Sequence, residues 1–212
     1  MSDRPRIYVL AGVNGGGKSS IGGAAVRASG ADYYNPDEAA RELMATQPNL
    51  TQAEANAAVW RTGRTLLESA IQKRRDFAFE TTLGGNTISR LLGEAARSGF
   101  EILVWYVGLK SPELHIERVA ARVRRGGHSI PAETIRQRYE RSRLNLVQLL
   151  PSLMTLRVYD NSNPADPHAG ELPTPRLVLH LEAGRILGPE DLSQTPDWAK
   201  PIVAAALQLT LS

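Results

Sequence analysis

A short glycine-rich segment near the start of the chain limits the folds that this sequence can adopt. Residues Gly12–Ser19, GVNGGGKS, have the spacing G-x-x-x-x-G-K-[ST] with every fixed position filled. This P-loop motif requires a buried strand before it and a helix after it, which Ile7–Leu10 and Lys18–Arg27 are expected to supply. The glycines allow backbone N–H groups to turn toward phosphate oxygens, and the helix adds its positive N-terminal end. The segment therefore predicts a phosphate-binding loop in an α/β domain.

The residue types of this loop predict binding of ATP with Mg²⁺. Lys18 is expected to reach the β- and γ-phosphates and to act in catalysis, and the hydroxyl of Ser19 is expected to be a metal ligand. The sequence contains no Asn/Thr-Lys-x-Asp segment that would recognise guanine, and no apolar strand that ends in a Walker-B Asp. These observations favour a small kinase. The residues expected to hold ATP are Gly12, Asn14, Gly15, Gly16, Gly17, Lys18, Ser19 and Ser20.

The rest of the chain alternates expected strands with expected helices. Apolar runs predict strands at 33–34, 77–79, 102–107 and 153–159, and helical patterns predict helices at 51–71, 87–97, 111–125 and 131–149. This alternation predicts a single α/β domain over residues 1–212, with a mostly parallel sheet flanked by helices. Beyond the fifth strand, Pro164, Pro167, Pro173 and Pro175 indicate a loop. Within an extension of 163–212, residues 177–187 predict a hairpin and Trp198–Leu209 a final helix.

Composition excludes some classes of site. The chain of 212 residues has no cysteine, which excludes disulfides, thiolate nucleophiles and cysteine-bound metals. Its apolar runs are too short for a signal sequence or a membrane span, so we expect a cytoplasmic location and no membrane partner. Of the 25 basic residues, 21 are arginine. Because the arginine fork matches phosphate oxygens, this bias suggests a phosphorylated ligand.

Two acids follow expected strands, at the sheet edge where ligands bind in open α/β folds. We expect Asp37 to act as the base that accepts the proton of an acceptor hydroxyl, with Glu80 and Thr82 positioning the substrate. Each acid has an alternative interpretation. Asp37 could simply favour the dipole of a helix that Asn35 caps, and Glu80 could form a salt bridge with a nearby arginine.

Arginines are concentrated in the segment 112–148, around Gly126-Gly127. Two helices joined by a glycine pair are typical of a lid that closes over phosphates and supplies cations to the transition state. The alternative is a solvated, ion-paired surface, and His128 is expected to be a polar loop residue. Arg122 is the expected catalytic arginine of this lid. The arginines expected to bind substrate are Arg118, Arg125 and Arg138.

With these residues in place, the chain resembles the zeta toxin family of P-loop kinases. The matching features lie within residues 6–162 and are the P-loop, Asn35-Pro36-Asp37, Phe79-Glu80-Thr81-Thr82, Gly126-Gly127-His128 and Arg138-Tyr139. The resemblance implies a five-stranded sheet of order 2-3-1-4-5 and an arginine-bearing lid. It also implies a hydroxyl acceptor such as a nucleotide sugar, an antitoxin protein as partner, and for Asp37, Glu80 and Thr82 the roles given above. Toxin members carry an arginine shortly after the threonine, where this chain has Gly84-Gly85-Asn86.

Three functions are compatible with these features. The first is an ATP-dependent phosphotransferase acting on a hydroxyl of a small molecule, a nucleotide or nucleotide sugar among them. The second is a kinase of polynucleotide ends, which the arginine excess favours but the aromatic content of 6% disfavours, because single-strand binders stack bases on aromatic rings. The third is a non-catalytic protein that uses ATP as a conformational switch.

Overall fold

A single seven-stranded sheet forms the centre of the computed structural model, which describes residues 4–23, 26, 30–163 and 174–211. The strand order is β2-β3-β1-β4-β5-β6-β7. The strands are β1 Arg6–Ala11, β2 Asp32–Tyr34, β3 Phe77–Thr81, β4 Glu101–Gly108, β5 Thr155–Asp160, β6 Arg176–Glu182 and β7 Arg185–Gly188. The first five pair in parallel, and β6 and β7 are antiparallel.

The expected order 2-3-1-4-5 is confirmed for the parallel strands, but the expected count of five strands was wrong. The predicted hairpin exists as β6 and β7, and it pairs with β5 instead of standing apart from the sheet. The physical reason is that β5 would otherwise be an edge strand with a row of unpaired backbone groups. Apolar residues Val178, Leu179 and Leu181 of β6 are buried, so the hairpin also extends the core.

The helices fall close to their expected places. They are α1 Lys18–Ile21, α3 Pro36–Thr46, α4 Gln52–Gln72, α5 Asn86–Arg97, α6 Pro112–Arg124, α7 Ala132–Leu149 and α8 Lys200–Leu211. The helix expected to run to Arg27 is described as α1 only to Ile21, and residues 24–25 and 27–29 lie outside the described residues, as do Pro164, Pro167 and Pro173. Within the described ranges, no helix has the length and apolar character needed to cross a bilayer.

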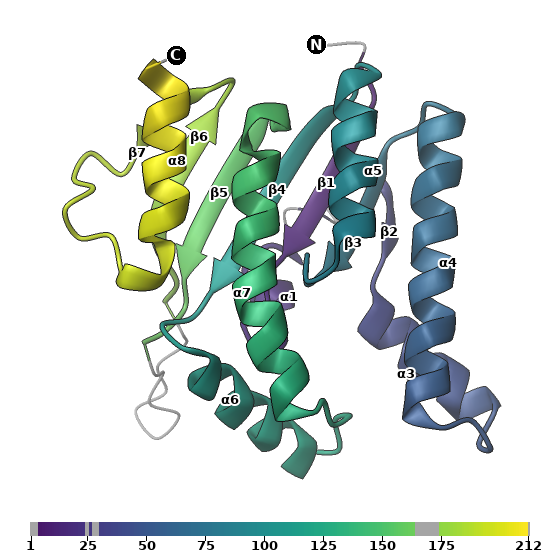
Figure 1. The fold of residues 1–212 in the computed structure, drawn as a ribbon. Helices are drawn as coiled ribbons and strands as arrows, with labels where there is room; N and C mark the ends of the chain where they lie inside the picture. Colours follow the sequence, from purple (N-terminus) through teal and green to yellow (C-terminus); the bar gives the residue numbers. More distant parts are fainter. Residues whose placement is uncertain (1–3, 24–25, 27–29, 164–173, 212) are drawn as a thin grey trace.

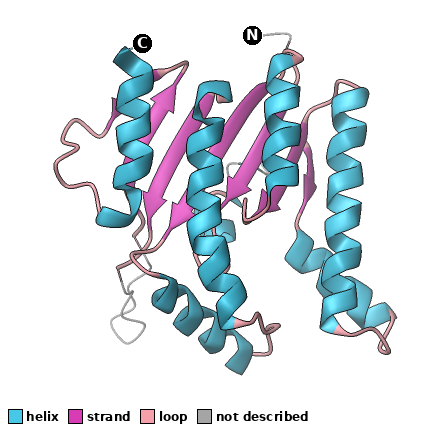
Figure 2. Cartoon of the chain, viewed as in Figure 1, coloured by secondary structure: helices cyan, strands magenta, loops and turns pink. Residues whose placement is uncertain are grey.

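Both faces of the sheet are covered. Helices α4, α5, α7 and α8 lie side by side over one face (Figures 1 and 2). Along β1, Ile7 and Val9 point into the large core beneath these helices, whereas Tyr8 and Leu10 belong to a smaller cluster with Val26 on the other face. Successive residues of a strand point to opposite faces, so a strand covered on both sides is apolar throughout. This explains the uninterrupted apolar run before the P-loop.

The carboxyl ends of the parallel strands point toward α6 and the start of α7 (Figure 1). Local signals fix where the helices at this end begin. The side chain of Asn35 caps α3, Thr51 and Glu54 form a capping box at the start of α4, and Ser111 caps α6. The expected lid, 112–148, is anchored over much of its length, because α7 buries Ile135, Leu146 and other apolar residues in the core.

Candidate active site

The P-loop is packed so closely that only glycine fits at its first position. Gly12 has a φ of 132°, and a Cβ atom there would lie 2.1 Å from the carbonyl oxygen of Val107 on β4. Gly17, with a φ of 88°, has a similar constraint, because its Cβ would lie 2.5 Å from Nδ2 of Asn161. Residues with side chains rarely adopt these angles. The glycines of the motif therefore allow the loop to curl against β4 and the segment after β5.

Three side chains hold this loop from outside. Nδ1 of His115, on α6, lies 2.9 Å from the carbonyl oxygen of Asn14. Nη1 of Arg138, on α7, donates to Oδ1 of Asn14 across 2.7 Å, and Nδ2 of Asn161 donates to the carbonyl oxygen of Gly16 across 3.0 Å. Burial lowers the pKa of His115 to about 4, so the ring is neutral at pH 7 and its Nδ1–H is the donor. The sequence analysis missed His115 and Asn161, since neither belongs to a motif.

Lys18 follows the last glycine of the P-loop. Its ammonium group makes no ion pair or side-chain hydrogen bond with any residue that the structure describes. Burial lowers its pKa, whereas the carboxylates of Glu80 and Asp37 raise it, and the net effect is a lowered pKa. A partly buried cation beside this glycine-rich loop is suited to a phosphate group, which supports the predicted role of the loop.

Glu80 ends β3 and is buried, with 7% of its surface exposed. Its Oε1 atom accepts hydrogen bonds from Ser19 Oγ (2.9 Å), Tyr33 Oη (2.5 Å) and Asn35 Nδ2 (3.2 Å). These three partners are neutral, and within the described residues Glu80 forms no salt bridge with an arginine, in contrast to the alternative interpretation. Tyr33, which the sequence analysis placed only in a strand, reaches Glu80 because β2 and β3 are neighbours in the sheet.

Asp37 lies in the first turn of α3, where Oδ1 of Asn35 accepts its backbone N–H across 2.9 Å. Its carboxylate contacts two groups of the lid segment: Nη1 of Arg122 lies 3.2 Å from Oδ2, and Nε2 of His128 lies 3.7 Å from Oδ1. The carboxylate of Asp37 therefore lies where it favours the dipole of α3 and also lies near the P-loop. Because Asn35 also donates to Glu80, one amide orients both acids.

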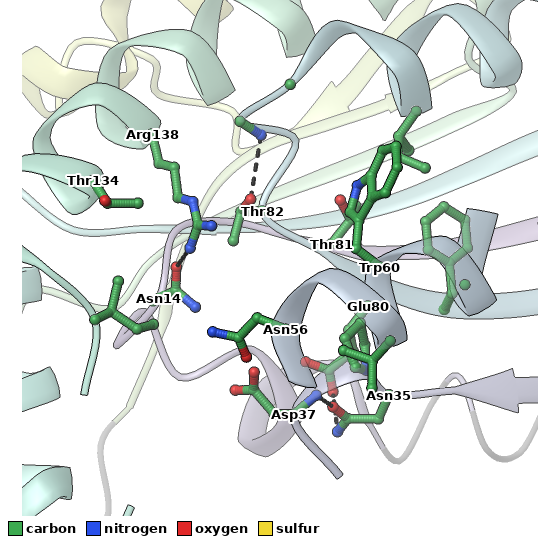
Figure 3. Close-up of a pocket in the computed structure, with 18 of the residues that line it drawn as sticks. Asn14, Asn35, Asp37, Asn56, Trp60, Glu80, Thr81, Thr82, Thr134 and Arg138 are labelled. Atoms are coloured by element: carbon green, nitrogen blue, oxygen red, sulfur yellow. Dashed lines mark hydrogen bonds between the residues drawn. The ribbon is translucent and has the colours of Figure 1, made fainter. Parts of the chain in front are cut away.

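A cavity of about 370 Å³ opens beside these groups. Figure 3 shows Asn14, Asp37 and Arg138 on one side of it and Trp60, from α4, on another. The apolar part of its wall comes from α4, α5 and the segment before α7, and Trp60 has 46% of its surface exposed. The polar residues that line the cavity include Lys18, Asn35, Asp37, Asn56, Glu80, Thr82, His128 and Arg138. This wall was not predicted, because Trp60 and Ile88 lie within ranges that the sequence identified only as helices.

The predicted arginines separate into two groups. Two of them lie on the side of the cavity. Arg122 pairs with Asp37, and Arg138 donates a hydrogen bond to Asn14. Arg118 instead donates from Nη2 to the carbonyl oxygen of Asn161 across 2.8 Å, at the other side of the P-loop. Arg125 ends α6 as an exposed residue, and its side chain forms no hydrogen bond or ion pair within the described residues.

Thr82 lines the cavity, and its hydroxyl accepts the N–H of Gly84. Ser20 is exposed.

Comparison with known proteins gives one family and several structural neighbours. Residues 1–169 match the family model described as "Zeta toxin". An uncharacterized protein of Haemophilus influenzae is 30% identical over 132 residues, which are 60% of this chain and 88% of that protein.

Two solved structures share the α/β fold at low sequence identity. A chain of the AvrRxo1-ORF1:AvrRxo1-ORF2 structure with sulphate ions has a TM-score of 0.67 and 14% identity to this chain. The match covers 96% of this chain and 64% of the AvrRxo1 chain, so this chain spans slightly less than two thirds of that neighbour's length. A chain of the PezAT chromosomal toxin–antitoxin system of Streptococcus pneumoniae has a TM-score of 0.59 and 12% identity, covering 100% of this chain and 89% of that chain.

Proposed function

This chain belongs to the zeta toxin family, and from that membership and the geometry of its site we propose that it is a kinase that transfers the γ-phosphate of ATP to a hydroxyl group of a small molecule. The observation that carries the proposal is the convergence of an unpaired lysine and a carboxylate on one cavity. Lys18 and Asp37 both line it, and the Asp37 carboxylate is close enough to raise the pKa of Lys18 against the larger effect of burial. A phosphate donor and a hydroxyl acceptor need this pair of groups side by side.

ATP is assigned to the P-loop. The inward-facing amides between Gly12 and Ser19 would bind the phosphates, and Lys18 would neutralise the charge that develops on the γ-phosphoryl oxygens. A further AvrRxo1-ORF1:AvrRxo1-ORF2 structure, described as a complex with ATP, supports this assignment, with a TM-score of 0.66 and 14% identity to this chain. Arg138, which donates to Asn14, and Arg118, which donates to Asn161 beside the loop, would keep the loop in its binding shape.

Mg²⁺ fits the oxygen atoms beside Lys18. The hydroxyl of Ser19 and the carboxylate of Glu80 lie 2.9 Å apart, and hard oxygen donors of this kind are the ligands that Mg²⁺ prefers. Ser19 would be the direct ligand, and Glu80 would orient it. When bound, the ion would offset the negative charge of the β- and γ-phosphates.

Asp37 is assigned the role of base. As the acceptor oxygen forms its bond to the γ-phosphorus and the bond to the ADP oxygen breaks, the hydroxyl proton passes to the carboxylate of Asp37. Asn35 fixes the helix turn that carries this carboxylate, and Arg122 lies 3.2 Å from its Oδ2. Arg122 would thus hold the Asp37 carboxylate in position before the transfer and stabilise charge during it.

The wall of the cavity favours an acceptor with a planar ring. Trp60 offers an exposed aromatic face, and Ile88 and Ile130 extend the apolar surface around it. Asn56 provides amide groups next to this surface. A nucleotide or nucleotide sugar has both a planar base and free hydroxyls, so we assign the acceptor to that class. Glu80, Thr82 and Arg138 would position the reacting hydroxyl.

The test is to supply the purified protein with γ-labelled ATP, Mg²⁺ and an extract of small metabolites, and to identify labelled products by mass spectrometry. Lys18→Ala should transfer label about 100-fold more slowly or worse, because one cation at the transferring phosphate is lost. A labelled small molecule that is absent from this control would support the kinase and identify its acceptor. Label on an added 5′-hydroxyl oligonucleotide alone would contradict the small-molecule acceptor. Tight ATP binding without any transfer would contradict a kinase and favour the switch.

A further inference from the structure

His128 lies at the contact between the lid segment and the proposed base. It follows the glycine pair between α6 and α7, lines the cavity, and has 12% of its side chain exposed. Nη2 of Arg122 lies 3.4 Å from His128 Nε2 and 3.4 Å from the His128 carbonyl oxygen. Nη1 of the same guanidinium lies 3.2 Å from Oδ2 of Asp37. One arginine therefore has one amino group on His128 and the other on Asp37.

The backbone of the loop is shaped around this arginine. The N–H of Gly127 donates to the carbonyl oxygen of Arg122 across 3.0 Å, which folds the loop back over the end of α6. A Cβ atom at Gly127 would lie 2.7 Å from Cγ of Arg122 and 3.1 Å from its carbonyl oxygen. The loop thus passes directly over the stem of Arg122, and this contact aligns His128 with the guanidinium group.

The hydrogen-bonding chemistry determines which form of the ring fits. A guanidinium group only donates, so the Nε2 atom that faces it must be an acceptor, and the ring must be neutral with its proton on Nδ1. A proton on Nε2 would remove that acceptor and place a second cation against Arg122. It would also place an N–H donor near Oδ1 of Asp37, which is 3.7 Å away.

We propose that neutral His128 is a positioning residue that holds Arg122 on Asp37, and that protonated His128 displaces Arg122 and pairs with the Asp37 carboxylate, which withdraws the base at acid pH. The expected loss of activity at acid pH rests on the proposed function, whereas the exchange of partners does not depend on it.

The charged groups around His128 favour the neutral form. They are Asp37 and Arg41 from α3, Arg122 from α6 and Arg138 from α7. Burial lowers the pKa of His128, Asp37 raises it, and the three guanidinium groups lower it, so that the pKa falls below its usual 6.5. The ring is therefore neutral at pH 7, and the change of partner occurs as the pH falls below 6.5.

The direct test is an NMR titration of the histidine ring protons in the full-length protein. The chain has 4 histidines, and His128→Gln identifies the resonance of His128 by its disappearance. We expect the wild-type ring to titrate below pH 6.5, Arg122→Gln to raise that midpoint, and Asp37→Asn to lower it. Shifts of opposite sign are the result expected for a ring that lies between this cation and this anion. A midpoint that neither variant moves would overturn the proposal.

A second test follows label transfer from ATP into the metabolite extract against pH. His128→Ala should slow transfer on the order of tenfold at pH 7.5, and His128→Gln should recover most of that loss, because the glutamine carbonyl can accept from Arg122 without titrating. The acid decline of the wild type should be absent from His128→Gln. An identical acid decline in His128→Gln would overturn the proposal.

Gly127→Ala provides a variant that leaves the histidine in place. Its Cβ should displace Arg122, slow transfer on the order of tenfold and abolish the effect of Arg122→Gln on the midpoint of His128. Gly93→Ala is the matched control, because Gly93 does not line the cavity and a Cβ there would meet only Nη1 of Arg97, at 3.6 Å. If the NMR midpoints respond as expected but no variant or wild type transfers label, the partner exchange stands and the proposed function fails. If neither variant moves the midpoint of His128 but label is transferred at the normal rate, the proposed function stands and the partner exchange fails.

Discussion

The hydroxyl of Ser19 donates a hydrogen bond to Oε1 of Glu80 across 2.9 Å, which joins the P-loop to the end of β3. The contact arises because β1 and β3 are parallel neighbours in which Leu10 pairs with Glu80, so the end of β3 lies beside the loop that follows β1. Sequence analysis predicted Ser19 as a metal ligand and Glu80 as a substrate residue. From this contact we propose a second role for Glu80, at the metal.

Glu80→Gln keeps the size of the side chain and removes its charge. We expect the Mg²⁺ concentration for half-maximal label transfer to rise about tenfold, as when a group that orients a metal ligand is lost. The measurement is transfer rate against Mg²⁺ at saturating ATP, with the exposed Glu94→Gln as control. If Glu80→Gln needs the same Mg²⁺ concentration as the wild type but a higher concentration of acceptor, Glu80 acts only at the acceptor site.

Gly84 and Gly93 form a pair for testing the position of Arg138. A Cβ at Gly84 would lie 2.7 Å from Cγ of Arg138, close to its backbone, whereas a Cβ at Gly93, outside the cavity, would meet only Nη1 of Arg97, at 3.6 Å. Gly84→Ala should therefore displace the guanidinium group from Asn14 and slow transfer on the order of tenfold, with Gly93→Ala near the wild-type rate. Equal rates for the two variants would show that Arg138 is not needed in this position.

His115 predicts a loss of stability at acid pH. Its pKa is lowered from 6.5 to about 4, mainly by burial, so the unfolded chain binds the proton more tightly than the folded chain does. Its contribution is therefore complete above pH 6.5 and declines as the pH falls toward 4. At about 1.4 kcal/mol for each pH unit of difference, the decline is about 3 kcal/mol. Urea unfolding between pH 7.5 and 4 measures it.

The control for that experiment is His115→Gln, which keeps a donor for the carbonyl oxygen of Asn14 but cannot titrate. Its free energy of unfolding should fall less between pH 7.5 and 4 than that of the wild type. Parallel curves for the two proteins would assign the acid sensitivity to other groups.

Trp198 links the extension after the family-matched residues to the nucleotide side of the site. Its indole N–H donates to Oδ1 of Asp160 across 3.2 Å, and the next residue, Asn161, holds the carbonyl oxygen of Gly16. Trp198→Phe should lower the free energy of unfolding by about 1–3 kcal/mol, because it leaves Asp160 without this donor, and should weaken ADP binding severalfold. Chemical denaturation and calorimetry measure the two effects, and unchanged ADP affinity would make Trp198 purely structural.

The fold was largely predictable because its signals are local. Asn35-Pro36 and Thr51 with Glu54 satisfy backbone N–H groups within their own helices, and Gly126-Gly127 ends α6 as expected. The antiparallel addition of β6 and β7 was not predictable, since alternating apolar residues indicate a hairpin but do not specify which strand it joins. That choice depends on the exposed edge of β5, a property of the assembled sheet.

Site residues that belong to a sequence motif could be predicted, whereas site residues that reach the cavity only through packing could not. Lys18 and Ser19 follow from the P-loop spacing, and the end-of-strand position of Glu80 indicated its place at the site. Tyr33 and Trp60 could not be recognised in this way, because each is an ordinary apolar or aromatic residue of its own element. Their places at the site come from neighbouring strands and from the face that α4 turns toward the cavity.

The measurement that tests the central claim most directly compares label transfer and ADP binding in the wild type, Asp37→Asn and Glu38→Gln. Glu38 is an exposed acid in the same helix turn and serves as the matched control. We predict that Asp37→Asn transfers the γ-phosphate at least about 100-fold more slowly, because it cannot accept the hydroxyl proton, while binding ADP within a few-fold of the wild type. Transfer by Asp37→Asn at the rate of Glu38→Gln would contradict the assignment of Asp37 as the base.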